Sequence, residues 1–260
     1  MKKPILSILF VICLSFQASA WNPMVVVSGG ESCPGEFCAD WNDVAIDDEV
    51  CAGGCPDTWD SLTDASTKMS VDTTGDQIQY TADSTAVAYL TEDTDIAEWT
   101  EATFIFTIEL SGVDPDDSNC SVSIFRTYNG GSDEQLCSLG IVHTESGEIN
   151  KIGKAVWNYA DTYSSEFGEI SLTANTEYNV YMYVKKGTDG VADGYCEVGL
   201  YDNTTAWIKL GTDAIENYER WNNHSNLDKI LYGAISNDCV DATITIRYDT
   251  FTAYNSDERP

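Results

Sequence analysis

Two stretches that mix aromatic rings with amides and acids are the first candidates for ligand recognition. They lie at residues 157–163 (WNYADTY) and 217–226 (NYERWNNHSN). Aromatic faces stack on sugar rings while amides and carboxylates hydrogen-bond hydroxyl groups, so this mixture is typical of carbohydrate-binding loops. The candidate residues are Trp157, Tyr159, Tyr163, Tyr218, Trp221 and Asn222. The alternative is that these rings pack against the edge of the domain.

Tyr181 and Tyr183 form a second aromatic candidate. They alternate with Val180 and Met182 within residues 178–185 (YNVYMYVK). A period of two is typical of a strand with one buried face, and the valine and methionine side is the expected core side. The two tyrosines therefore either line an open sheet surface and contact a glycan, or lie under the N-terminal arm.

Oxygen-bearing side chains crowd the expected turn at residues 114–119 (DPDDSN). Hard cations such as calcium bind several oxygen ligands. The candidate ligands are Asp114, Asp116, Asp117 and Asn119. Asp189 and Asp193 form a smaller group, and neither group has the EF-hand pattern. Calcium is therefore an expected cofactor, and a solvated acidic turn is the alternative.

The sequence shows no recognisable catalytic motif, so no residue is assigned a catalytic role. His143 and His224 are the only histidines, and no H-E-x-x-H or closely spaced pair is present. This argues against a catalytic zinc ion. The G-x-S-x-G pattern of many serine hydrolases is also missing.

The N-terminus predicts export. Lys2 and Lys3 precede an apolar run at residues 5–16 and a small-residue site at 18–20 (ASA), so a signal peptide is expected at residues 1–20. Its removal changes the formal charge from −30 to −32, because two lysines and no acids are lost. This charge repels nucleic acids and anionic membranes. We expect a secreted or extracellular protein, periplasmic or surface-bound if bacterial, with no membrane span; its partner would be a glycan or a neighbouring protein.

An even number of cysteines remains after cleavage, which predicts disulfides in an exported chain. They are Cys33, Cys38, Cys51, Cys55, Cys120, Cys137, Cys196 and Cys239. Pairing of near neighbours in the sequence is expected: Cys33–Cys38, Cys51–Cys55, Cys120–Cys137 and Cys196–Cys239. The alternative for the first four is a zinc site, although their spacings fit the usual two-residue knuckles poorly.

Alternating segments separated by turns predict an all-β fold. The clearest are residues 103–110, 178–185 and 242–254. In the strand at 120–127, Val122, Ile124 and Arg126 are expected on one face. Residues 77–80 and 86–91 are expected to form a hairpin.

About a dozen such strands, with turns every 8–12 residues, favour a two-sheet antiparallel jelly-roll sandwich. The expected organisation is a signal peptide at 1–20, an irregular Cys- and Gly-rich N-terminal arm at 21–65, the sandwich at 66–254 and a tail at 255–260.

Three segments carry a family resemblance. Residues 172–180 (LTANTEYNV) are similar to the entry of a central strand, 197–203 (EVGLYDN) to a strand ending in a tight turn, and 244–254 (ITIRYDTFTAY) to a closing strand. Together they resemble the concanavalin A-like lectin/glucanase superfamily, which includes laminin-G-like domains. Glu177 and Asn203 depart from its usual aromatic and glycine. The resemblance spans about residues 66–254 and implies a jelly-roll fold in which calcium is frequent.

Enzymes with this architecture supply two further comparisons. Glucanases carry an E-x-D-x-x-E triple on one strand; residues 145–148 (ESGE) and 166–170 (EFGEI) are the nearest stretches and lack it. Polysaccharide lyases need a Tyr or His base with Arg, Lys or Gln to neutralise a uronate. Their Arg-rich strand and Q-I-H segment are missing, the chain has four arginines, and its charge disfavours an anionic substrate.

The principal functional hypothesis is therefore an exported, non-catalytic, lectin-like carbohydrate-binding module, with calcium assisting. A structural or adhesion protein of a surface assembly is the first alternative. A glycoside hydrolase or lyase with a dispersed acid/base pair is the second.

Overall fold

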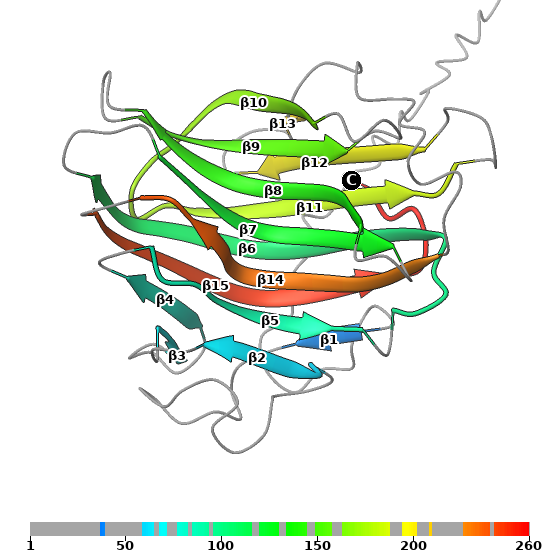
Figure 1. The fold of residues 1–260 in the computed structure, drawn as a ribbon. Helices are drawn as coiled ribbons and strands as arrows, with labels where there is room; N and C mark the ends of the chain where they lie inside the picture. Colours follow the sequence, from blue (N-terminus) through cyan, green and yellow to red (C-terminus); the bar gives the residue numbers. More distant parts are fainter. Residues whose placement is uncertain are drawn as a thin grey trace, which may run out of the picture.

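The computed structural model contains two antiparallel β-sheets that pack face to face as a sandwich (Figure 1). It describes residues 37–39, 59–64, 68–71, 77–82, 85–93, 96–115, 120–129, 134–144, 149–157, 163–187, 194–201, 208–209, 226–239 and 242–259. These residues contain no α-helix, which confirms the predicted all-β class. Most of the expected N-terminal arm lies outside them. Within the described ranges, no helix is long and apolar enough to cross a membrane.

The seven-stranded sheet has the order β10-β9-β8-β7-β14-β5-β2. Its strands are β2 (Ser61–Asp64), β5 (Ala88–Glu92), β7 (Cys120–Asn129), β8 (Glu134–Thr144), β9 (Ile149–Trp157), β10 (Tyr163–Leu172) and β14 (Leu227–Asn237). The pairing of β7 with β14 shifts register twice, and so does the pairing of β7 with β8. Such bulges bend strands and change which face a side chain occupies.

The eight-stranded sheet has the order β13-β12-β11-β6-β15-β4-β3, with β1 also paired to β15. Its strands are β1 (Phe37–Ala39), β3 (Met69–Val71), β4 (Ile78–Ala82), β6 (Glu101–Pro115), β11 (Glu177–Lys185), β12 (Tyr195–Tyr201), β13 (Ile208–Lys209) and β15 (Ala242–Tyr254). β6 is central because it pairs with β11 along one side and β15 along the other.

The strand predicted at residues 178–185 is confirmed as β11, and the one predicted at 242–254 is β15. The expected hairpin is wrong, because β4 pairs with β15 in one sheet and β5 with β14 in the other. The chain therefore passes from one sheet to the other between β4 and β5. β1 and β2 come before residue 66, yet both are paired within the sheets.

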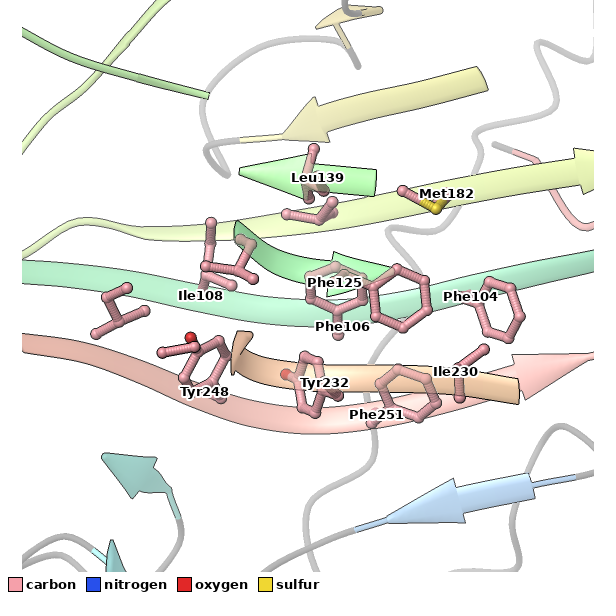
Figure 2. Packing of buried hydrophobic residues seen from close by; sticks show 14 of the residues in the cluster. Phe104, Phe106, Ile108, Phe125, Leu139, Met182, Ile230, Tyr232, Tyr248 and Phe251 are labelled. Atoms are coloured by element: carbon pink, nitrogen blue, oxygen red, sulfur yellow. The ribbon is translucent and has the colours of Figure 1, made fainter. Parts of the chain in front are cut away.

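Aromatic rings from both sheets fill the space between them (Figure 2). Phe106 on β6, Tyr232 on β14 and Phe251 on β15 are fully buried. Tyr232 lies 5.2 Å from Phe106 and 5.0 Å from Phe251, measured between ring centroids. Rings at these separations add specific packing to the area they bury, so this cluster fixes the two sheets face to face.

Two disulfides differ from the expected pairing: Cys120 bonds to Cys239 and Cys137 to Cys196. The sequence had suggested Cys120–Cys137, but these residues lie at opposite ends of the β7–β8 pairing. Cys120 instead lies beside the end of β14, its other neighbour. The second bond joins β8 to β12 and so connects the two sheets. The expected bonds Cys33–Cys38 and Cys51–Cys55 are not described by the structure.

Candidate functional site

The two outer faces of the sandwich differ in accessibility. On the seven-stranded sheet, Arg126, Tyr128 and Lys229 are half-buried and Ser236 is exposed. On the eight-stranded sheet, outward-facing Tyr181 on β11 is only 2 % exposed, whereas Arg247 on β15 is half-buried. We call the outer side of the seven-stranded sheet the open face, and that of the eight-stranded sheet, which is buried at β11, the covered face. The open face is the candidate site because it groups accessible basic and phenolic side chains.

A bulge in β7 brings Arg126 to the open face. Ser123 pairs with Gly140, but Phe125 pairs with the next β8 residue, Leu139, so Ile124 is an extra residue. Phe125 therefore enters the core and Arg126 points outward. The sequence had suggested that Arg126 shares a face with Val122; that expectation is wrong, because strict alternation does not survive the extra residue.

Two serines hold the Arg126 guanidinium group. Its Nε donates to Ser123 Oγ at 2.9 Å, and its Nη2 donates to Ser236 Oγ at 2.6 Å. Because the two serines come from β7 and β14, the group is fixed between neighbouring strands. A guanidinium has five N–H donors, so most of its donors remain for other partners, and its planar fork matches a carboxylate.

Lys229, Tyr128 and Gln135 form a row across β14, β7 and β8 by backbone pairing. The Lys229 Nζ atom lies 4.9 Å from the centre of the Tyr128 ring, which is cation–π geometry. Gln135 Nε2 is buried and has no hydrogen-bond partner in the described structure. A phenol, an ammonium group and an amide donor thus lie next to Arg126, two residues along β7.

The β2–β5 edge of the open face is acidic. Asp93 follows β5, and its backbone N–H donates to Asp60 Oδ2 at 2.8 Å. The side-chain hydrogen bond with Asp60 is the main reason that the pKa of Asp93 is raised, and burial adds to it. The positive groups are therefore local, at the β7–β14 centre of the sheet.

Carboxylates and tyrosines dominate the covered face. Tyr181 Oη donates to Glu197 Oε1 at 2.7 Å, and Tyr195 Oη donates to the other oxygen of the same carboxylate. Tyr183 Oη donates to Glu101. Burial, followed by the hydrogen bond to the carboxylate, raises the pKa of both Tyr181 and Tyr183. These phenols stay protonated in neutral solution and act as donors.

The chain end after β15 lies across this face, and its marked end is beside β11 and β12 in Figure 1. Thr103 Oγ1 donates to Ser256 O at 2.7 Å and accepts the Glu258 N–H at 3.0 Å. Arg259 reaches Glu197 at 3.2 Å. Tyr181 and Tyr183, predicted either to contact a glycan or to lie under the N-terminal arm, are buried beside the residues that follow β15 instead.

The other predicted sugar-binding residues are only partly described. Trp157 and Tyr163 pair with each other across β9 and β10, at the end of the sheet where Tyr128 and Gln135 lie. Tyr159, Tyr218, Trp221 and Asn222 lie outside the described residues. Their role in binding stays a prediction.

The calcium hypothesis also stays a prediction. Asp114 lies in β6, whereas Asp116, Asp117 and Asn119 are outside the described residues. Among described side chains, the one group close enough to share a metal is Cys120, Asp238 and Cys239. Both cysteines are in a disulfide, and Asp238 accepts from the Ser121 backbone N–H and hydroxyl group, so this group is structural.

Comparison with known proteins gives structural similarity alone. No protein-family profile and no curated protein sequence matches the chain. Among solved structures, the alginate lyase Aly36B, in a variant bound to an alginate tetrasaccharide, gives a TM-score of 0.61 at 13% identity over 86% of this chain and 98% of its own. The PL-14 alginate lyase of Aplysia kurodai gives 0.54 at 10% identity, covering 75% and 90%. The alginate lyase of Klebsiella pneumoniae gives 0.53 at 9% identity, covering 74% and 85%.

These similarities establish the class of fold, a jelly-roll-type β-sandwich of the kind found in alginate lyases. The assignment to the concanavalin A-like superfamily stays a prediction. The principal functional hypothesis, a non-catalytic lectin-like module, is corrected by this finding: the three structures named above are alginate lyases, and the alternative of a glycoside hydrolase or lyase fits them better.

Proposed function

We propose that the protein is a polysaccharide lyase that cleaves a uronate-containing glycan, with alginate as the first substrate to test. The observation that carries the proposal is the grouping of Arg126, Tyr128, Lys229 and Gln135 on the open face. The similarity of the fold to alginate lyases supports it, because those sandwiches accommodate the same chemistry.

β-Elimination from a uronate requires three tasks. A cation or hydrogen-bond donor neutralises the carboxylate, which makes the proton on C5 more acidic. A base removes this proton as the C4–O4 bond breaks and a C4=C5 double bond forms. The departing oxygen takes up a proton, so no water is consumed and no metal is required by the balance of atoms.

Arg126 suits the first task. Its guanidinium group is held by Ser123 and Ser236 but retains free donors, and a guanidinium binds a carboxylate through two parallel hydrogen bonds. Gln135 Nε2, which has no partner, adds a neutral donor on the neighbouring strand.

Tyr128 suits proton transfer. Its hydroxyl is the titratable group nearest to Arg126 along β7, and Lys229 lies against its ring. A tyrosine hydroxyl is one of the side-chain groups that can take up or release a proton in general acid–base catalysis. The same phenol can return the proton to the departing oxygen.

The charge of −30 does not exclude this substrate. Net charge acts at long range and is screened within about 10 Å at 0.1 M salt. Arg126 and Lys229 act in contact with the ligand, where charge-assisted hydrogen bonds are strongest. The net charge is a sum over the whole chain and does not describe the local positive groups of the open face.

The test is incubation of the purified protein with alginate and, in parallel, with neutral β-glucan. We expect ultraviolet absorbance from an unsaturated uronate with alginate alone. Tyr128→Phe should lower this rate by at least about 100-fold, the usual contribution of a positioned proton-transfer group. Tyr201→Phe, on β12 in the other sheet, is the matched control and should retain the rate. Reducing ends without the unsaturated product would indicate hydrolysis and contradict the proposal.

A further inference from the structure

Thr127 lies between two residues of the proposed active site, Arg126 and Tyr128, but its own side chain is in the core. It is 0 % exposed. Successive side chains of a strand point to opposite faces, so the inward direction of Thr127 goes with the outward direction of both neighbours. Its pairing partners, Ile230 on β14 and Cys137 on β8, are buried as well. Thr127 therefore lies in the inner layer directly beneath the site.

A second bulge lies beside Thr127, in the partner strand β8. Cys137 pairs with Thr127, but Tyr128 pairs with Gln135, so Leu136 is an extra residue. Two residues of a bulged strand oppose one residue of its partner, and here Leu136 and Gln135 oppose Tyr128 together. Without the extra residue, Leu136 alone would lie opposite Tyr128. A slip of one residue moves a side chain to the other face, so Gln135 would turn away from the site.

The Thr127 hydroxyl group is bonded to the backbone at one side of this bulge. Its Oγ1 accepts the Cys137 N–H at 3.2 Å and donates to the Cys137 carbonyl oxygen at 3.4 Å. A bulge disrupts the ladder of backbone hydrogen bonds, and a buried backbone group without a partner is unfavourable. The hydroxyl group, which is both donor and acceptor, stabilises the backbone at this point.

A disulfide holds the same residue from the other sheet. Cys137 is bonded to Cys196 on β12, which restrains movement of its backbone along β7. The register on this side of the bulge is therefore held by a covalent bond and by the Thr127 hydroxyl group. A change in the bulge is taken up on its other side, by Leu136 and Gln135.

Gln135 is the site residue whose position depends most on this bulge. Its Nε2 atom is buried and has no hydrogen-bond partner among the described residues. No described hydrogen bond to this atom fixes the amide, so the backbone that carries it determines where it lies. Directly opposite residues of an antiparallel pair have Cβ atoms about 5 Å apart, which brings the amide within reach of Tyr128.

We propose that Thr127 is a positioning residue of the open-face site: its hydroxyl group holds the bulge at Leu136 and thereby keeps the Gln135 amide beside Tyr128. The catalytic consequence of this inference rests on the proposed lyase function. A misplacement of about 1 Å can lower a rate by about 100-fold, so a residue that touches no substrate controls the rate through the group that it places.

The test compares Thr127→Val with Thr127→Ser. Valine keeps the branching of threonine but lacks the hydroxyl group, whereas serine keeps the hydroxyl group. In Thr127→Val, kcat on alginate per folded molecule should fall at least about tenfold, while KM changes less than about threefold because Arg126 still binds the carboxylate. Thr127→Ser should recover kcat to within about threefold of the wild-type value. If Thr127→Val does not fold, Thr127→Ala removes the hydroxyl group without adding bulk and takes its place.

Thr107→Val on β6 is the matched control. Thr107 is also a buried threonine, and its Oγ1 donates to Asn179 Oδ1 at 3.3 Å in the eight-stranded sheet. Both valine variants should lower the melting temperature, but Thr107→Val should retain kcat. An equal loss of kcat in both valine variants, or no loss in Thr127→Val, overturns the proposal.

A double variant tests whether Thr127 acts through Gln135. Thr127→Val combined with Gln135→Ala should have the same kcat as Gln135→Ala alone, because residues that act as a unit are not additive. Losses that multiply would mean that Thr127 affects the rate by another route and would contradict the inference.

The NMR signals of the Gln135 side-chain amide provide a readout that needs no activity. They are identified as the signals missing from Gln135→Ala. They should shift in Thr127→Val and keep their wild-type positions in Thr127→Ser and Thr107→Val. A wild-type protein that leaves alginate intact would contradict the lyase proposal, and this measurement would still decide the placement of Gln135. Unchanged signals in Thr127→Val overturn the inference.

Discussion

The open and covered faces use the same kinds of residue for different purposes. Tyr128 lies beside Lys229 at a half-buried position, whereas Tyr181 donates to Glu197 and is 2 % exposed. Arg126 is held by two neutral serines, whereas Arg259 is held by carboxylates and rings. Donors matched to opposite charges stabilise the fold; donors held by neutral groups keep their charge available for a ligand.

The largest expected difference concerns stability. Glu197→Ala should lower the free energy of unfolding by about 3 kcal/mol, because it removes the carboxylate that accepts from buried Tyr181 and one of the two carboxylate partners of Arg259. Glu109→Ala is the matched control on the same face and should cost about 1 kcal/mol, because that pair is more exposed. Urea unfolding measures both. Equal losses of unfolding free energy would show that Glu197 contributes no more to stability than Glu109 does.

The next difference concerns catalysis. Arg126→Ala should lower kcat/KM on alginate by about 30-fold, or about 2 kcal/mol, which is the usual range for a hydrogen bond to a charged group. Arg126→Lys should recover only part of this, because lysine lacks the planar fork. Arg247→Ala, on the covered face, should leave kcat/KM unchanged. A larger loss of kcat/KM in Arg247→Ala than in Arg126→Ala would indicate that the active site lies on the eight-stranded sheet.

Ionic strength separates long-range from local charge. Raising the salt from about 0.01 to 0.15 M shortens the screening length from about 30 to 8 Å. The chain repels a polyanion at low salt, so we expect KM for alginate to fall by up to about tenfold across this range. Steady-state rates at constant pH measure it. A rise in KM instead would mean that local attraction by Arg126 and Lys229 dominates at all distances.

The smallest effect lies in the core between the faces. Tyr248 Oη is buried without a hydrogen-bond partner, so Tyr248→Phe should raise the free energy of unfolding by about 1 kcal/mol. Tyr80→Phe is the control and should lower it, because Tyr80 Oη donates to Ala86 O at 2.5 Å. Denaturant unfolding at neutral pH distinguishes the two.

The same variant tests alkaline stability. Burial raises the pKa of Tyr248 well above its usual value of 10.0. The folded state therefore favours the neutral phenol, and this contribution is complete below pH 10 and is lost as pH rises further. Tyr248→Phe should reduce the loss above pH 10 by about 1.4 kcal/mol per pH unit. An unchanged slope of unfolding free energy against pH would show that groups other than Tyr248 cause the loss of stability above pH 10.

Alternation in the sequence was sufficient to find the long strands and their core sides. Val180 and Met182 are buried as the pattern of β11 required. It was not sufficient for β7, because one extra residue at Ile124 reverses the face of Arg126. No sequence motif could have identified the proposed catalytic residues Arg126, Tyr128, Lys229 and Gln135, because they come from β7, β8 and β14. The available signal was an arginine, Arg126, in the middle of an otherwise apolar strand.

Long-range relations were the hardest to predict. Whether Tyr181 and Tyr183 face solvent depends on a tail that follows β15, more than 70 residues later in the chain. The disulfide partners were chosen by closeness in sequence, but Cys120 and Cys239 are 119 residues apart. Both are consequences of strand order, which local periodicity does not contain.

The Cys137–Cys196 bond gives the two faces a shared mechanical link. Cys137 is two residues from Gln135 on the open face, and Cys196 is next to Glu197 on the covered face. The bond spans 59 residues of sequence, and a loop of that length corresponds to about 4 kcal/mol of lost chain entropy in the unfolded state. It is also a covalent connection through the core, so a force that pulls β12 outward is transmitted to β8, a strand of the open face.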